Sequence, residues 1–174
     1  MSPSLRLLFL LLLLFAPLSS RADPAPTLAG TWKINPALSS DLTPWRDLTV
    51  TLSHSGDTVT LHRAFSSGRR QFDETITLDL SLELNLVPVA WWPDNRHLGA
   101  YAGGDKTKRI RATWLDQGRI LRLSTDLTLS TQQGLREVNI LSDYKVSANG
   151  AQLTLTELRS TRNRPVVYVF TRAN

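Results

Sequence analysis

The strongest constraint on the fold is a series of short turn signals, each separating two stretches in which apolar and polar residues alternate. Each signal contains glycine, which reaches positive φ without strain and favours the two-residue turns that join antiparallel strands. Between the turns the residues alternate with period two and show no helical periodicity. The chain is therefore predicted to be a succession of β-hairpins. The turns are centred on Gly56-Asp57, Gly68-Arg69, Gln117-Gly118, Gln133-Gly134 and Asn149-Gly150.

The registers implied by these turns agree with one another. A two-residue turn determines which residues lie opposite each other, and opposed residues share one face of the sheet. The turn after residue 55 places Leu52 opposite Leu61, and the next turn places the same Leu61 opposite Ile76. Both hairpins thus select one apolar face for the strand that they share. The other predicted pairs are also apolar: Leu48 with Phe65, Phe65 with Phe72, Val59 with Leu78, Trp114 with Leu121, Ala112 with Leu123, Leu129 with Val138, Leu127 with Ile140, Val146 with Leu153, and Tyr144 with Leu155.

The opposite faces of these strands are polar, as in Thr49 and Thr51 or Arg122 and Ser124. Strands with one wet face form antiparallel sheets, and sheets of this total length form a barrel or a sandwich. Residues 72–86 alternate for longer than one ordinary strand and are predicted to be a bent strand or two consecutive strands. The sequence predicts one all-β domain of eight to ten strands. The chain has no cysteine, so this domain depends on its core for stability.

The N-terminus has the pattern of a secretory signal peptide. Arg6 precedes an apolar run at 7–16, and the small residues Ser20 and Ala22 form a cleavage signal. The run is shorter than the roughly 20 apolar residues that a membrane-spanning helix needs. We expect removal of residues 1–22 and export of the mature domain, with no membrane span, to the periplasm or outside the cell. Nucleic acid is not an expected partner.

Basic residues cluster at 106–111 and 159–164. The formal net charge of the whole chain is +5. Contact with anionic lipid or cell-wall polymer is one interpretation of such clusters. Solvated strand ends and turns are the interpretation that we favour.

Two ends of the predicted domain resemble a known family. Gly-Thr-Trp-Lys-Ile-Asn-Pro-Ala-Leu-Ser at 30–39 contains the Gly-x-Trp pattern of the first strand of lipocalin-like barrels. Tyr-Lys-Val-Ser-Ala-Asn-Gly-Ala-Gln-Leu-Thr-Leu at 144–155 resembles the closing hairpin of exported bacterial lipocalin-like proteins of unassigned function. The resemblance implies a lipocalin-like, antiparallel up-and-down barrel over residues 23–174, with an apolar interior and no catalytic residues. A C-terminal helix, present in secreted lipocalins, is not evident.

Arg63 and Glu74 are predicted to point into the interior, directly opposite each other. An isolated buried charge costs many kcal/mol, so we expect the two side chains to pair. One interpretation is a structural ion pair near the barrel mouth. The other is that Arg63 anchors a carboxylate or polar head group of a ligand through bidentate hydrogen bonds, with Tyr144 as a second anchor. Ser142 and Glu157 form a second inward polar pair.

The segment 87–106 is the second candidate site. Its prolines and glycines interrupt regular structure, and an irregular stretch of about twenty residues in a compact domain is more often functional than accidental. Trp91, Trp92, His97 and Tyr101 are suited to stacking on a sugar or covering the barrel mouth. The alternative interpretation is a long connection whose tryptophans cap the core.

Metal, cofactor and catalytic sites are not predicted. His54 and His62 are expected on opposite faces and His97 in the loop, whereas a metal site needs three or four converging ligands. No Gly-x-Ser-x-Gly motif is present. The preferred function is binding of a small hydrophobic or amphipathic ligand in the barrel. The alternative is a cell-envelope interaction protein that uses the Trp91–Tyr101 loop on a polysaccharide or protein, and an enzyme is a distant third.

Overall fold

The order of the strands in the sheet explains the shape of the molecule. The computed structural model describes residues 27–40, 42, 45–89 and 101–173. Within these residues one antiparallel sheet has the order β4-β3-β2-β1-β11-β10-β9-β8-β7-β5, and β6 pairs with β8 off this path. The elements are β1 (Gly30–Ile34), η1 (Pro36–Leu38), β2 (Asp47–Ser55), β3 (Thr58–Ser67), β4 (Arg70–Asp79), β5 (Asn85–Pro88), β6 (Tyr101–Ala102), β7 (Thr107–Leu115), η2 (Asp116–Gly118), β8 (Ile120–Thr131), β9 (Gly134–Val146), β10 (Gln152–Arg159) and β11 (Val166–Arg172).

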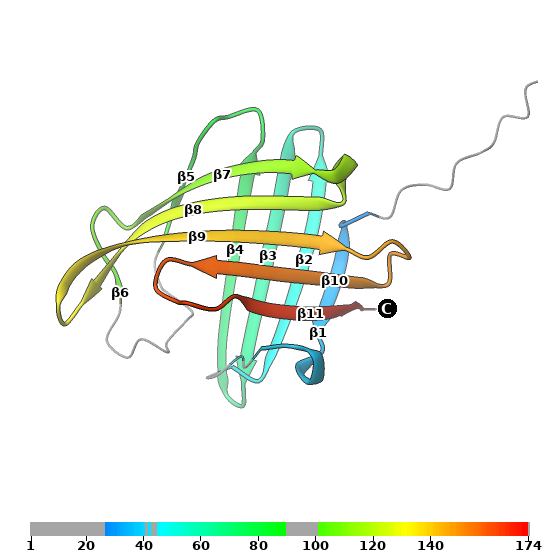
Figure 1. Cartoon of the computed structure of the whole chain (residues 1–174), viewed down its shortest axis with the longest axis horizontal. Helices are drawn as coiled ribbons and strands as arrows, with labels where there is room; N and C mark the ends of the chain where they lie inside the picture. The colour runs from blue at the N-terminus through cyan, green and yellow to red at the C-terminus, as the bar shows by residue number, and fades with distance from the viewer. Residues whose placement is uncertain (1–26, 41, 43–44, 90–100, 174) are drawn as a thin grey trace, which may run out of the picture.

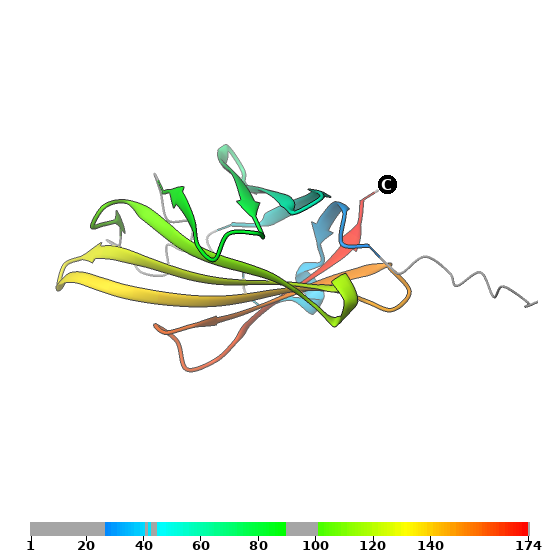
Figure 2. The same cartoon turned by 90° about the horizontal axis from the view of Figure 1, so that it is seen from above.

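The sheet curls into a nearly closed, flattened barrel of two layers. Strands β2 to β4 run behind β7 to β11 and cross them in Figure 1, and Figure 2 shows the two layers from above. The first strand, β1, joins the layers because it pairs with β2 on one side and β11 on the other. Apart from β4 and β5, strands of this path that follow one another in the sequence are also neighbours in the sheet. The barrel is therefore up-and-down and ten-stranded, as predicted. In the described part of the chain no helix is long and apolar enough to cross a membrane.

Most of the predicted registers are confirmed. Leu52 lies opposite Leu61, and Leu61 lies opposite Ile76. The pairs of the hairpins β7–β8 and β9–β10 are also as predicted. Residues 72–86 form two consecutive strands, β4 and β5, with a turn between them. Leu61, Ile76 and the interior residues of the other layer consequently belong to one buried cluster.

One predicted register is wrong. Leu127 lies opposite Val138 rather than Ile140, and Leu129 lies opposite Arg136 rather than Val138. The turn is formed by residues 132–133, one position earlier than predicted, because the Thr131 hydroxyl accepts a hydrogen bond from the Gln133 amide at 3.2 Å and donates to the Gly134 carbonyl at 2.9 Å. Moving the turn by one position changes the partner of each β8 residue by two positions on β9. Because side chains alternate with period two, the same side chains still face inward.

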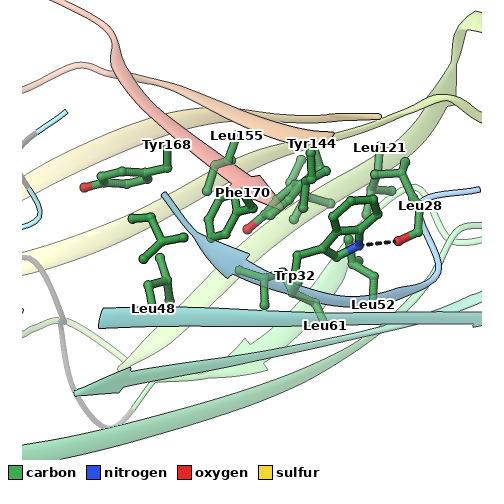
Figure 3. Close-up of a cluster of buried hydrophobic side chains, with 14 of the residues drawn as sticks. Leu28, Trp32, Leu48, Leu52, Leu61, Leu121, Tyr144, Leu155, Tyr168 and Phe170 are labelled. Atoms are coloured by element: carbon green, nitrogen blue, oxygen red, sulfur yellow. Dashed lines mark hydrogen bonds between the residues drawn. The ribbon is translucent and has the colours of Figure 1, made fainter. Parts of the chain in front are cut away.

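The core is divided into two clusters. The larger one fills the space between the layers, where Trp32, Phe170 and Tyr144 point toward one another from β1, β11 and β9 (Figure 3). All three side chains are almost fully buried. The smaller cluster lies under the long β8–β9 hairpin and consists of Leu127, Leu129, Val138 and Ile140.

An arginine closes the Trp32 end of the barrel. The Arg172 guanidinium lies 4.2 Å from the centre of the Trp32 ring, and it donates to the carbonyl oxygens of Ala29 at 2.9 Å and Thr27 at 3.0 Å. Gly30 has a φ of 134°, and a Cβ at this position would collide with that guanidinium. The Gly-x-Trp pattern therefore has a direct physical explanation: the glycine leaves room for the cation that covers the tryptophan.

Replacing Arg172 by methionine removes the cation over Trp32 and both carbonyl contacts. We expect a loss of about 1–3 kcal/mol in the free energy of unfolding, measured by urea denaturation. The control is Arg70→Met, which changes an exposed arginine at the β3–β4 turn and should shift stability by no more than about 0.5 kcal/mol. Equal effects of the two substitutions would contradict this role of Arg172.

Candidate functional site

A carboxylate shared by two cations lies on the interior face of the barrel. Arg63 of β3 lies opposite Glu74 of β4, as predicted. Its Nε donates to Glu74 Oε2 at 3.1 Å, and its Nη2 contacts the same oxygen. Lys108 of β7 contacts the other carboxylate oxygen through Nζ. The side chains of Arg63, Glu74 and Lys108 are 16%, 12% and 5% exposed, so this is a buried triad.

A second ion pair lies on the same interior face. Arg159 Nε donates to Glu157 Oε2 at 3.0 Å, and both side chains are buried. Ser142 lies opposite Glu157, as predicted, and is also buried. The phenol of Tyr144, two residues further along β9, interacts with Arg63. The predicted inward polar residues are thus gathered in one region.

These groups surround a small cavity of about 60 Å³. A cavity of this volume holds a few water molecules or a small head group, whereas pockets for drug-sized ligands measure roughly 300–1,000 Å³. The polar part of the lining is Arg63, Lys108, Thr125, Ser142, Tyr144, Glu157 and Arg159, and the rest is Leu61, Ile76, Ile110, Leu123 and Ile140.

The balance of charge in this region favours an anion. Three cationic side chains, Arg63, Lys108 and Arg159, face two carboxylates, Glu74 and Glu157, so the formal charge is +1. Burial alone opposes ionisation of these groups. This excess of cationic side chains attracts an anion, and charges in a low-dielectric interior interact more strongly than charges in water.

The pKa values follow from burial and from the pairing. Burial opposes ionisation of Glu74, but Arg63 and Lys108 outweigh it and lower the pKa of Glu74 to about 2. Burial also opposes the charge on Arg63, yet Glu74 outweighs it and raises the pKa of Arg63. Burial and then the charge of Arg63 lower the pKa of Lys108. Burial lowers the pKa of Arg159 to about 10 and raises that of Tyr144.

The loop candidates do not join this site in the described structure. Trp91, Trp92 and His97 lie outside the described residues. Tyr101 is in β6, opposite Ser130, and is 66% exposed. The predicted irregular segment 87–106 is partly regular, since residues 87–88 belong to β5 and residues 101–102 form β6.

The described histidines, His54 and His62, do not line the cavity. The ring of His54 packs edge-on against Trp114, with 5.8 Å between ring centres. His62 lies 3.1 Å from the Asp73 carboxylate. Among the described residues no three histidine, aspartate or glutamate side chains are grouped as a metal site.

Lys108 and Arg159 belong to the two basic clusters that we interpret from the sequence as solvated strand ends and turns. For these two residues that interpretation is wrong, because both side chains are buried. The alternation of inward and outward residues along the two strands indicates the interior position of both side chains. Lys108 precedes the inward Ile110 by two residues, and Arg159 follows the inward Glu157 by two. Strand residues two apart share a face, so both cations belong to the interior set.

Comparisons with known proteins bear on the fold. No protein-family model matches this sequence, and no curated protein sequence matches it. Secretory abundant heat soluble protein 4 from Ramazzottius varieornatus has a similar structure, with a TM-score of 0.52 and 10% identity, over 89% of this chain and 100% of that chain. At this identity the similarity shows the fold alone. The architecture is a lipocalin-like antiparallel barrel, as predicted.

Two weaker structural similarities add nothing to this assignment. A second secretory abundant heat soluble protein from Ramazzottius varieornatus has a TM-score of 0.49 and 14% identity, over 86% of this chain and 100% of that chain. A fatty-acid-binding protein from Manduca sexta has a TM-score of 0.43 and 13% identity, over 83% of this chain and 98% of that chain.

The shared carboxylate should make stability depend on acid pH. The pKa of Glu74 is lowered from 4.5 to about 2 in the fold, so its ionised form stabilises the protein fully above pH 4.5. This contribution is lost as the pH falls from 4.5 toward 2. We expect the free energy of unfolding to fall less steeply over this range in Glu74→Gln than in the native protein. The control is Asp73→Asn, which changes an exposed neighbour; equal acid sensitivity of the two variants would contradict the role of Glu74.

Proposed function

We propose that this protein binds a small amphipathic molecule with an anionic head group inside its barrel. The observation that carries the proposal is the buried excess of cations around the interior cavity. A guanidinium offers a fork of donors that matches a carboxylate or phosphate, and Lys108 adds a compact charge. The head group would contact Arg63, Lys108 and Tyr144, beside the carboxylate of Glu74.

The apolar part of the ligand would lie against aliphatic side chains next to the cations. The cavity lining includes Leu61, Ile76 and Ile110 of the larger cluster. It also includes Ile140, which belongs to the smaller cluster under β8 and β9. The cavity thus lies between the two apolar clusters. A tail of more than a few atoms requires this part of the interior to widen.

For Glu74 and Arg63, the proton affinities favour ion binding over acid–base catalysis. General acid–base catalysis works best with a pKa close to the operating pH. The pKa of Glu74 is about 2, and that of Arg63 is raised above its ordinary value. Both groups therefore keep their charge near neutral pH, as anchors for an ion do.

Calorimetric titration with sodium decanoate tests the proposal, with decanol as a neutral probe of the same chain length. We expect decanoate to bind the native protein and Arg63→Met to weaken binding at least about tenfold, since the variant lacks the bidentate anchor. The triple variant Arg63→Met, Glu74→Met and Lys108→Met removes the whole triad and leaves Arg159 paired with Glu157, so it should fold but not bind.

The matched control is Arg122→Met. Arg122 donates from Nε to Asp143 Oδ1 at 2.7 Å, is half-exposed and lies away from the cavity. Its loss should leave decanoate binding unchanged. Native mass spectrometry of protein purified from its own host should show a bound anion. The proposal fails if no ligand co-purifies and the native protein does not distinguish decanoate from decanol.

We further propose that the barrel acts after export from the cytoplasm. The support is the signal-peptide pattern of residues 1–22, which lie outside the described residues. Intact-mass measurement of the protein from its host should show a chain beginning at Asp23. Ser20→Lys with Ala22→Lys should leave the leader uncleaved, because the small residues of the cleavage signal are lost. An uncleaved native chain in the cytoplasm would contradict export.

A further inference from the structure

Within the residues that the structure describes, the barrel has one seam that is not closed by a ladder of backbone hydrogen bonds. The path of the sheet begins at β4 and ends at β5, and these two end strands are not paired with each other. Every other neighbouring pair on the path is joined by a ladder of backbone hydrogen bonds. Separating any of those pairs breaks a ladder, whereas the seam separates without such a loss.

Two side-chain contacts close the seam in place of a ladder. The Asp79 amide of β4 donates to Asn85 Oδ1 at 2.8 Å, and Asn85 Nδ2 donates to the Asp79 carbonyl at 3.0 Å. The side-chain amide of Asn85 thus forms with Asp79 the two hydrogen bonds that a neighbouring strand would otherwise form at this end of the seam. Further along, the Lys108–Glu74 ion pair joins β7 to β4.

The interior cavity lies directly behind the seam. Ile76 lines it from β4, and Lys108 and Ile110 line it from β7. The Lys108–Glu74 contact therefore borders both the seam and the cavity. A ligand larger than about 60 Å³ must widen this space, and the seam is the boundary where widening breaks the fewest hydrogen bonds.

We infer that the seam between β4 and β5–β7 is the entry route for the ligand, and that the Lys108–Glu74 contact is its latch. This inference rests on the proposed function. An arriving anionic head group competes with Glu74 for Lys108 and for Arg63. The ligand thus weakens the latch with the same charge that the site recognises.

The test locks the seam from outside. Thr77 and Leu86 are exposed residues of β4 and β5 that flank it, and the native chain has no cysteine. Thr77→Cys with Leu86→Cys, joined by a bismaleimide, should slow association of the fluorescent carboxylate 11-dansylaminoundecanoate at least about tenfold in stopped flow. Dissociation of the bound probe should slow as well, because entry and exit use one route.

The control lock joins two strands that are already hydrogen-bonded. Ser53 of β2 lies opposite Thr60 of β3, and cysteines at these positions joined by the same reagent should leave the association rate unchanged. An unchanged rate in the locked seam, or equal slowing by both locks, would overturn the entry route while the proposed function stands. Absence of probe binding by the unmodified protein would overturn both.

The latch has a readout that needs no ligand. Lys108→Met removes the ion pair across the seam, and hydrogen exchange of the β5 amides should then accelerate at least about tenfold. Exchange in the β9–β10 ladder should stay unchanged. Uniform acceleration in all strands, or none in β5, would show that the ion pair does not hold the seam.

Discussion

The whole structure depends on which alternate residues of each strand face inward, here called the parity of the strand, and the short turns determine it. A slip by one residue would turn every inward side chain toward water, so all buried contacts require each hairpin to keep its register. The position of the β8–β9 turn shows how this constraint acts. Thr131 moves the turn by one residue, yet the opposed pairs shift by two and Leu127 and Val138 still face inward.

The same parity brings charge into the barrel together with the apolar side chains. Arg63 lies between Leu61 and Phe65 on the inward face of β3, and Glu74 is directly across from it on β4. Burying either one alone would cost several kcal/mol, whereas the triad with Lys108 compensates each charge except one. The half of the interior that contains the triad therefore retains a positive charge and a cavity, whereas the half around Trp32 contains fully buried side chains such as Trp32 and Phe170.

Interactions within hairpins could be predicted from the sequence, and interactions between distant strands could not. The Arg63–Glu74 pair followed from a single turn. Arg63 is two residues from the inward Leu61 and therefore shares its face, and the turn places Glu74 directly opposite Arg63. Lys108 of β7 reaches Glu74 of β4 across the seam, and these two strands are joined by no turn and by no ladder that sets a register. Arg172 likewise meets Trp32 only because the last strand returns to pair with the first. The exact turn at residue 132 depended on one hydroxyl, which a glycine-based pattern does not detect.

These two halves of the interior have different consequences for motion. The end closed by Arg172 and Trp32 is held by paired strands on both sides of β1, so local opening there would break two ladders at once. The seam is held by an amide and an ion pair, both of which are side-chain contacts. Regions stabilised by fewer backbone hydrogen bonds open at lower free energy. The paired end thus maintains the barrel, while the charged half lies beside the seam, where opening breaks fewer backbone hydrogen bonds.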